Sequence, residues 1–276
     1  VSVASNGVVY KTSQRGIIPA ILEKWFNERV EYKGLAKKYG KEGNDELHGY
    51  FNRRQYVQKI LLNSFYGVLG LTGFRFYDID NAEATTTTGV KLIQFTEKVT
   101  NHYYNNLLGT DEDYCIYTDT DSVFYSAIPL VKKRYPDADI SDDKFMTEQI
   151  LDIASEVQEY INKSYMYFAN EFLNIGEDHR FDIKQEVIAK SGIWVAKKRY
   201  AQWIINNNGV DCDELEVKGL DVVRSNFPPT FKNFMKGMLK DILELKDRNQ
   251  IDQDVIDFRK NLSNSNIIDI AKPSGL

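Results

Sequence analysis

Two aspartates separated by one residue stand in the middle of an apolar stretch. Asp119 and Asp121 lie between the β-prone runs Tyr114–Tyr117 and Val123–Tyr125, which predicts a hairpin with its tip at Thr118–Ser122. Residues at i and i+2 of a strand point to the same side, so these carboxylates would repel one another unless a divalent cation lay between them. Hard oxygen ligands favour magnesium or manganese, with water and phosphate oxygens completing the shell. A solvated, aspartate-rich turn is the other interpretation.

A second group of polar side chains interrupts a helical pattern predicted over Phe51–Leu69. Lys59, Asn63 and Tyr66 fall within about 60° of one another on a helix, while the apolar residues point elsewhere. An ammonium, an amide and a phenol could hold a triphosphate and a base, and Gly67 would allow another group to approach closely. The other interpretation is the solvent face of an ordinary helix.

Two cations occur four residues apart on a preceding helix, which is predicted at Ala20–Leu35. Arg29 and Lys33 would project from one face of that helix. If this helix and the next form an antiparallel hairpin, both cations can face the same gap as Lys59 and contact phosphate. Surface salt bridges with neighbouring glutamates are the alternative.

A basic run occurs within a predicted strand at Ile193–Ile205. Lys197, Lys198 and Arg199 are followed directly by Tyr200. Three cations beside an aromatic ring suit contact with the backbone or minor groove of a nucleic-acid duplex. A charged strand edge that discourages aggregation is the alternative.

The remaining periodicities predict a mixed α/β chain whose strands and helices position these four groups. Further strands are predicted at Val8–Tyr10, Phe74–Tyr77 and Phe181–Ile188, helices at Ala84–Leu107, Lys144–Leu173 and Pro228–Leu262, and turns at Lys37–Gly49 and Asn206–Gly209.

Bulk composition narrows the class of protein. With 276 residues, 42% hydrophobic and 27% charged, the chain is long enough for one large or several interlocked domains. The formal net charge of −5 argues against a nucleic-acid binder, but Ile21–Gly70 holds nine Lys and Arg against six Asp and Glu. Two cysteines, Cys115 and Cys212, fit no metal spacing. We expect a cytoplasmic protein, in the host-cell cytoplasm if the chain is viral, that does not bind a membrane.

Three of these motifs, taken in order, resemble the motifs of family B DNA polymerases. They are Lys59-x-x-x-Asn63-Ser64-x-Tyr66-Gly67, Tyr117-Thr118-Asp119-Thr120-Asp121-Ser122 and Lys197-Lys198-Arg199-Tyr200. The segments Gly16–Pro19, Phe26–Arg29 and Leu71–Asn81 are most similar to those of the replicative polymerases of T-even-type bacteriophages.

The resemblance implies an α+β fold in which a palm, an antiparallel sheet with helices, carries a helical-hairpin fingers insertion and a mainly helical partial thumb. Residues 1–17 and 73–220 would form the palm, 18–72 the fingers and 221–276 the incomplete thumb. The implied activity is template-directed DNA synthesis from dNTPs on a primer 3′-hydroxyl with two magnesium ions, for which manganese can substitute.

The resemblance also implies roles for single residues. Asp121 would bind both metal ions, Asp119 would sit beside them, and Glu186 would be a further carboxylate near the metals. The triphosphate would be held by Arg29, Lys33, Lys59 and Asn63, and Lys59 would also take part in catalysis. Tyr66 and Gly67 would line the nascent base pair, while Lys197, Lys198, Arg199 and Tyr200 would bind the primer-template.

The family motif Asp-x-x-Ser-Leu-Tyr-Pro does not occur in the sequence, which begins with Val1. We therefore expect a separate upstream portion to supply the first catalytic aspartate and the exonuclease, and the chain alone not to extend a primer. A sliding clamp is a further expected partner. The alternatives are a non-catalytic DNA-binding subunit of a split polymerase and an unrelated metal-dependent nuclease that uses Asp119 and Asp121.

Overall fold

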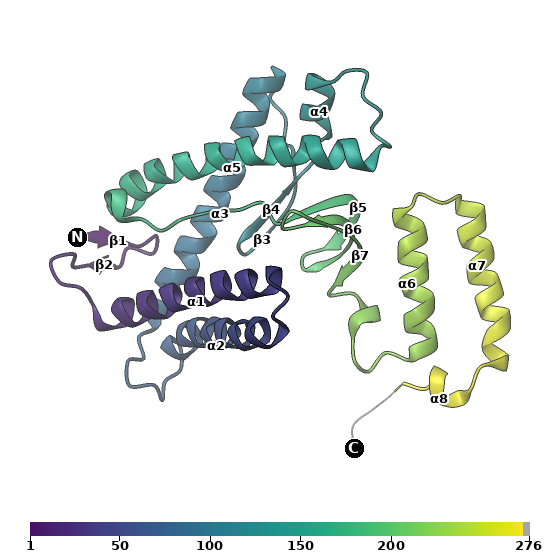
Figure 1. The fold of residues 1–276 in the computed structure, drawn as a ribbon, viewed down its shortest axis with the longest axis horizontal. Coiled ribbons are helices and arrows are strands. Elements are labelled where there is room, and N and C mark those ends of the chain that lie inside the picture. The colour runs from purple at the N-terminus through teal and green to yellow at the C-terminus, as the bar shows by residue number, and fades with distance from the viewer. Residues whose placement is uncertain (273–276) are drawn as a thin grey trace. The chain divides into compact units, whose positions relative to one another are not determined.

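Helices make up most of residues 1–272, the part of the chain that the computed structural model describes (Figure 1). The helices are α1 (Ile17–Lys41), α2 (Asp45–Leu69), α3 (Ile79–Leu108), α4 (Ile128–Arg134), α5 (Asp143–Leu173), α6 (Pro229–Leu243), α7 (Arg248–Asn261) and α8 (Ile267–Ile270). The strands are β1 (Ser2–Val3), β2 (Val9–Tyr10), β3 (Cys115–Asp119), β4 (Ser122–Tyr125), β5 (Val187–Ala196), β6 (Arg199–Asn207) and β7 (Val210–Lys218). All strand pairs are antiparallel, so the fold is α+β.

The chain divides into two units, and helices α3 and α5 contribute to both. The first unit contains Val1–Phe95 and Ser164–Phe181. The second unit contains Thr96–Lys163 and the chain from Asp182 onward.

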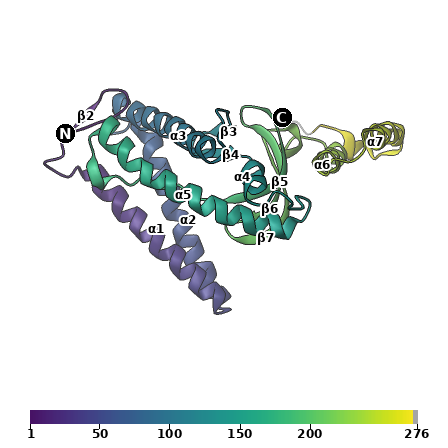
Figure 2. The same cartoon turned by 90° about the horizontal axis from the view of Figure 1, so that it is seen from above.

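The first unit is built around an antiparallel pair of helices, α1 and α2, which lie side by side in both views (Figures 1 and 2). Helix α1 extends six residues beyond the predicted end at Leu35 and α2 begins before the predicted Phe51, so most of the turn predicted at Lys37–Gly49 is helical. The reason is packing between the helices: the ring of Tyr39 stacks on that of Phe51 with centroids 5.6 Å apart. This contact outweighs the low helix propensity of the single glycine, Gly40, near the end of α1.

The prediction of a strand at Phe74–Tyr77 is wrong. The segment forms turns, in which the N–H of Phe74 bonds to the carbonyl of Leu71 and that of Tyr77 to the carbonyl of Phe74. The rings of Phe74 and Phe65 are 5.9 Å apart, so Phe74 packs against α2, while Phe76 and Tyr77 remain exposed and the segment does not pair with a strand.

The second unit contains the three-stranded sheet β5-β6-β7 and the separate hairpin β3-β4. The predicted Asn-Gly turn is confirmed, because Asn208 and Gly209 join β6 to β7 with φ angles of 52° and 81°. Such angles match the tight turn that suits the twist of a hairpin. The strand predicted at Phe181–Ile188 begins only at Val187, and residues 181–186 form no regular strand.

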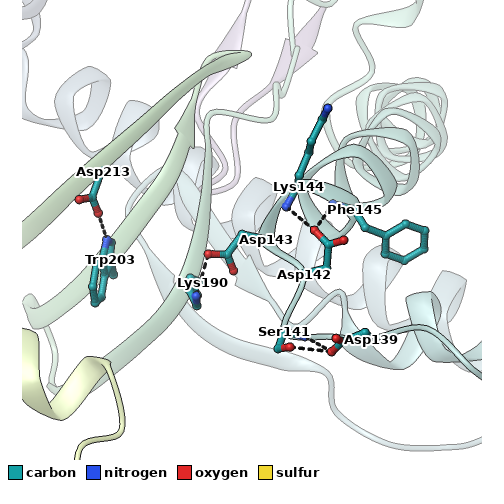
Figure 3. Close-up of polar contacts among 9 residues, drawn as sticks. All are labelled: Asp139, Ser141, Asp142, Asp143, Lys144, Phe145, Lys190, Trp203 and Asp213. Carbon is teal, nitrogen blue, oxygen red and sulfur yellow. Dashed lines mark hydrogen bonds and ion pairs between the residues drawn. The ribbon is translucent and has the colours of Figure 1, made fainter.

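Helix α5 starts at a capping aspartate beside the sheet. Asp142 accepts hydrogen bonds from the backbone N–H groups of Lys144 and Phe145, both at 3.1 Å (Figure 3). The next residue, Asp143, forms an ion pair of 2.7 Å with Lys190 of β5. These contacts satisfy the first free N–H groups of the helix and join its start to the sheet.

Apolar clusters hold the helices of the second unit. One cluster joins Tyr104 of α3 to the short helix α4 and to Ile153 of α5. Another joins Ala201 of β6 to Leu243 of α6. Between α6 and α7, the rings of Phe234 and Phe258 stack with centroids 3.8 Å apart. No helix among the described residues is long and apolar enough to cross a membrane.

Candidate active site

The two aspartates lie at the tip of the β3-β4 hairpin, as predicted. Asp119 is the last residue of β3 and pairs with Ser122, which leaves Thr120 and Asp121 as a two-residue turn. Thr120 has a φ of 38°, in the left-handed region that a β-branched residue adopts at a cost in energy. Its hydroxyl donates to the carboxylate of Asp119 at 3.0 Å.

Strand alternation was the reason for expecting both carboxylates on one side, and only Asp119 lies in a strand. Asp121 belongs to the turn and not to the strand, so the alternation of strand side chains does not apply to it. The side chain of Asp119 is 21% exposed, whereas Asp121 is an exposed residue. The two acids therefore occupy different environments, one partly enclosed and one open to solvent.

The basic run forms a second tip. Ala196 at the end of β5 pairs with Arg199 at the start of β6, so Lys197 and Lys198 are the two residues of a hairpin turn. The strand predicted at Ile193–Ile205 is therefore broken here. Because Lys197, Lys198 and Arg199 are all exposed, the turn presents its cations to solvent.

These two tips contact one another within the second unit. The ammonium of Lys198 lies 2.6 Å from a carboxylate oxygen of Asp119 and 3.2 Å from the hydroxyl of Thr120. The backbone N–H of Lys198 also donates to the Tyr117 hydroxyl at 2.7 Å. The hydrogen bond from Lys198 lowers the pKa of Asp119, and the same bond raises the pKa of Lys198. Asp119 is thereby held ionised beside a cation.

Aromatic rings support the contact between the tips. Phe124 of β4 lies 5.7 Å from Trp194 of β5 and 5.9 Å from Tyr200 of β6, measured between ring centroids. Tyr117 of β3 lies 5.8 Å from Tyr200. Because the side chains interlock, the position of one hairpin depends on that of the other.

Tyr200 differs from its neighbours in the basic run. Only 5% of the residue is exposed, and the ammonium of Lys218 lies 5.6 Å from its ring centroid. The ring therefore serves as a support beneath the turn, and the exposed contact surface consists of the cations before it.

Glu186 lies just before β5, at the opposite end of that strand from the Lys197–Lys198 turn. Its carbonyl accepts a hydrogen bond from the N–H of Asn208 at 2.6 Å. Among residues 1–272 there is no group of three or more His, Cys, Asp or Glu side chains that could hold a metal ion. The structure therefore does not bring Glu186 together with both aspartates in one preformed cluster.

The donor set at the acidic tip fits a hard divalent cation in part. Asp119 and Asp121 offer carboxylate oxygens, which magnesium prefers, but magnesium needs about six oxygens and usually takes the rest from water and phosphate. The ammonium beside Asp119 shows that this position already attracts positive charge. These two residues can be part of a metal site and do not complete one.

The residues predicted to bind a triphosphate all lie in the first unit, on α1 and α2. Gln58 of α2 donates a hydrogen bond of 2.6 Å to Glu28 of α1, which shows that these two positions face each other. Arg29 and Lys59 each come one residue after a member of this facing pair. In two antiparallel right-handed helices the residue after a facing position turns toward the same side of the pair, so Arg29 and Lys59 project from one flank of the hairpin.

The other members of this group follow at helical spacing. Lys33 lies four residues after Arg29, while Asn63 and Tyr66 lie five and eight residues after Gln58. These spacings keep all three side chains on the same flank of the hairpin. Lys33, Lys59, Asn63, Tyr66 and Gly67 are exposed, whereas Arg29 is half-buried and its Nε atom is buried without a partner among the described residues. The flank is thus a strip of exposed polar groups beside one buried guanidinium nitrogen without a partner among the described residues.

Sequence reasoning assigned no role to Tyr117, although this residue lies within the aspartate motif. Its hydroxyl is the acceptor that holds the Lys198 backbone. A tyrosine two residues before the first aspartate of a predicted hairpin was the available signal, because alternation puts it on the same face of the strand as that aspartate.

Comparison with known proteins identifies relatives over almost the whole chain. The family model for DNA polymerase family B matches residues 1–274. DNA-directed DNA polymerases of Escherichia phage RB69 and Enterobacteria phage T4 are each 26% identical over 88% of this chain and 33% of the relative. A DNA polymerase of Paramecium bursaria Chlorella virus NY2A is 30% identical over 84% of this chain and 22% of the relative. The chain therefore spans about a third of the length of the phage proteins that it matches.

Proposed function

The chain belongs to DNA polymerase family B, and on that premise we propose that it carries most of the nucleotidyl-transfer site of a template-directed DNA polymerase. The observation that supports this most directly is the ion pair between Asp119 and Lys198. It joins the acidic turn, suited to metal binding, to the basic turn, suited to a primer backbone.

We propose the division of the chain that the family resemblance implies. Residues 1–17 and 73–220 would be the palm, 18–72 the fingers and 221–276 the beginning of a thumb, of which 273–276 lie outside the described residues. The α1-α2 hairpin supports the fingers assignment, since it is a helical pair with a polar flank.

In the proposed reaction, the primer 3′-hydroxyl attacks the α-phosphorus of a dNTP, a new P–O bond forms, and pyrophosphate leaves. Magnesium, when bound, would supply Lewis-acid stabilisation of the attacking and leaving oxygens. Asp119 and Asp121 would be ligands from this chain. Lys198 would contact the backbone of the primer terminus, which would then lie beside the acidic turn.

The fingers residues would act on the nucleotide. Arg29, Lys33 and Lys59 would hold the triphosphate and neutralise the negative charge that develops on the leaving pyrophosphate. Cations aimed at a transferring phosphoryl group stabilise its transition state. Asn63 would hydrogen-bond to the same triphosphate.

The remaining contacts concern the base pair and the duplex. Tyr66 and Gly67 would lie against the nascent base pair, whose sequence is read by base pairing with the template. Lys197 and Arg199 would contact phosphates of the duplex and position it without reading its sequence. Tyr200 would support this contact from beneath.

We propose that an upstream portion completes the enzyme. Asp119 and Asp121 alone do not provide enough carboxylate ligands to complete a metal site. The chain also spans only about a third of the length of its phage relatives. That portion would supply a further aspartate, in an Asp-x-x-Ser-Leu-Tyr-Pro motif, together with an exonuclease. A sliding clamp would be a partner of the complete enzyme.

The experiment is to sequence the coding DNA upstream of Val1, in the same frame and in neighbouring genes, and to express the polymerase with that portion. Single-nucleotide incorporation on a primer-template is then measured for the wild type and for Asp121→Asn. We expect incorporation by the wild type, and loss of turnover with DNA affinity retained in the variant.

Three results would contradict the proposal. Incorporation that does not depend on Asp121 would remove the assigned metal ligand. Degradation of the DNA without incorporation would indicate a nuclease, and DNA binding without either reaction would indicate a binding subunit.

A further inference from the structure

We propose that Gly219 is a positioning residue for nucleotidyl transfer, because only a residue without a side chain lets the Lys197–Lys198 turn close on the acidic turn. The inference rests on the proposed function and extends it to a residue outside the aspartate, fingers and basic motifs. Gly219 comes directly after β7, the last strand of the sheet.

The backbone of Gly219 lies directly against the turn. A Cβ built on it would overlap the carbonyl oxygen of Lys198, and it would lie 3.0 Å from the carbonyl carbon of Lys198 and 3.2 Å from Cγ of Arg199. The φ of Gly219 is 67°, a left-handed angle that other residues adopt at a cost. Both the available space and the backbone angle therefore require glycine.

The Lys198 residue is held from the other side as well. Its N–H donates to Tyr117 at 2.7 Å, and its ammonium lies 2.6 Å from Asp119. Gly219 packs against the carbonyl of the same residue. Lys198 is thus fixed between the end of β7 and the β3-β4 hairpin, and its φ of 61° is part of that conformation.

A methyl group at position 219 would displace the turn. Its clash is with backbone atoms, which cannot rotate away as the end of a flexible side chain can. Carbon atoms pack best at about 3.5–4.0 Å, so the carbonyl carbon of Lys198 would have to retreat by roughly 0.5–1 Å and its oxygen by more. A misplacement of about 1 Å can cost about a hundredfold in rate.

Gly209 provides a matched control in the same sheet. It also has a left-handed φ, 81°, and nothing lies within 4 Å of a Cβ added to it. Gly209→Ala therefore carries the backbone cost of Gly219→Ala without the overlap.

The test uses the complete polymerase with its upstream portion. We expect Gly219→Ala to lower the single-turnover incorporation rate by about a hundredfold with little change in apparent dNTP affinity, whereas Gly209→Ala keeps the wild-type rate. Gly219→Ala should lose more thermal stability than Gly209→Ala, because it adds the overlap with Lys198 to the backbone cost that both variants share. Adding Lys198→Ala to Gly219→Ala should lower the rate only slightly further, because the contact is already lost.

If Gly219→Ala does not fold, Gly219→Asn replaces it, with Gly209→Asn as its control. Asparagine tolerates a left-handed backbone better than alanine and still carries the Cβ. We expect the same loss of rate for Gly219→Asn.

The outcomes separate the inference from the proposed function. A wild type that does not incorporate nucleotides would refute the proposed function. An active wild type in which the variants at 219 and 209 are equally fast, or in which the losses from Gly219→Ala and Lys198→Ala multiply, would refute the role of Gly219 alone.

Discussion

Replacement of Tyr117 by phenylalanine removes a single contact between the two hairpins. The hydroxyl accepts the backbone N–H of Lys198 at 2.7 Å, while the ring lies 5.9 Å from Phe124 and 5.8 Å from Tyr200. Phenylalanine keeps both ring contacts. A hydrogen bond of this kind contributes about 0.5–1.5 kcal/mol net, and since the turn is exposed, water can replace the lost acceptor.

We therefore expect Tyr117→Phe to lower the free energy of unfolding by about 1 kcal/mol. If the same energy holds Lys198 in place for the reaction, the incorporation rate of the complete polymerase falls about fivefold. The assay is single-turnover incorporation on a primer-template, with urea unfolding measured in parallel.

Tyr125→Phe is the matched control, because it removes a hydroxyl from the other strand of the same hairpin. The Tyr125 hydroxyl donates to the carbonyl of Glu97 at 2.9 Å, away from the basic turn. We expect a similar loss of stability and an unchanged rate. A Tyr117→Phe enzyme with the wild-type rate, or equal loss of rate in both variants, would refute the reasoning.

Three further predictions concern other positions. Lys59→Ala in the complete polymerase should weaken apparent dNTP affinity about tenfold or more, since it removes a charge-assisted contact; an unchanged affinity in a dNTP titration would contradict the fingers assignment. The pKa of Asp119 is lowered from its ordinary value of 3.8 by Lys198, so the ion pair stabilises the fold above about pH 4 and this stabilisation is lost as pH falls through the lowered pKa. The gap in stability between wild type and Lys198→Ala should therefore narrow in acid unfolding curves, and a gap that stays constant to pH 2 would contradict it. Gly192→Ala should destabilise the fold by about 1–3 kcal/mol, because a Cβ would lie 2.5 Å and 2.7 Å from ring atoms of Trp194; a melting temperature equal to that of the wild type would show that the ring moves freely.

Helices and hairpins with a strong local pattern were predictable. The helices α3 and α5 begin and end close to the predicted residues, and the Asn208-Gly209 turn is in place. Periodic apolar residues and turn-forming residues act through neighbours in the sequence, so their effect can be read without knowledge of the fold.

Predictions that depended on distant partners were less accurate. Phe74–Tyr77 has the composition of a strand, but the ring of Phe74 packs on α2 and no strand pairs with the segment. The basic run has the composition of a strand edge, yet Lys197 and Lys198 form a turn. In both segments tertiary contacts outweighed a weak local preference, as expected for β structure.

The sequence by itself determined the chemical groups of the candidate site, since Asp119, Asp121 and the cations of the basic run are recognisable from residue type and spacing. Only the tertiary structure decided that Lys198 contacts Asp119 across 79 residues of chain, and that Gly219 lies against the same turn. The physical reason is that spacing along a chain fixes which side chains share a strand or a helix face, whereas the approach of two turns depends on how all the intervening elements pack.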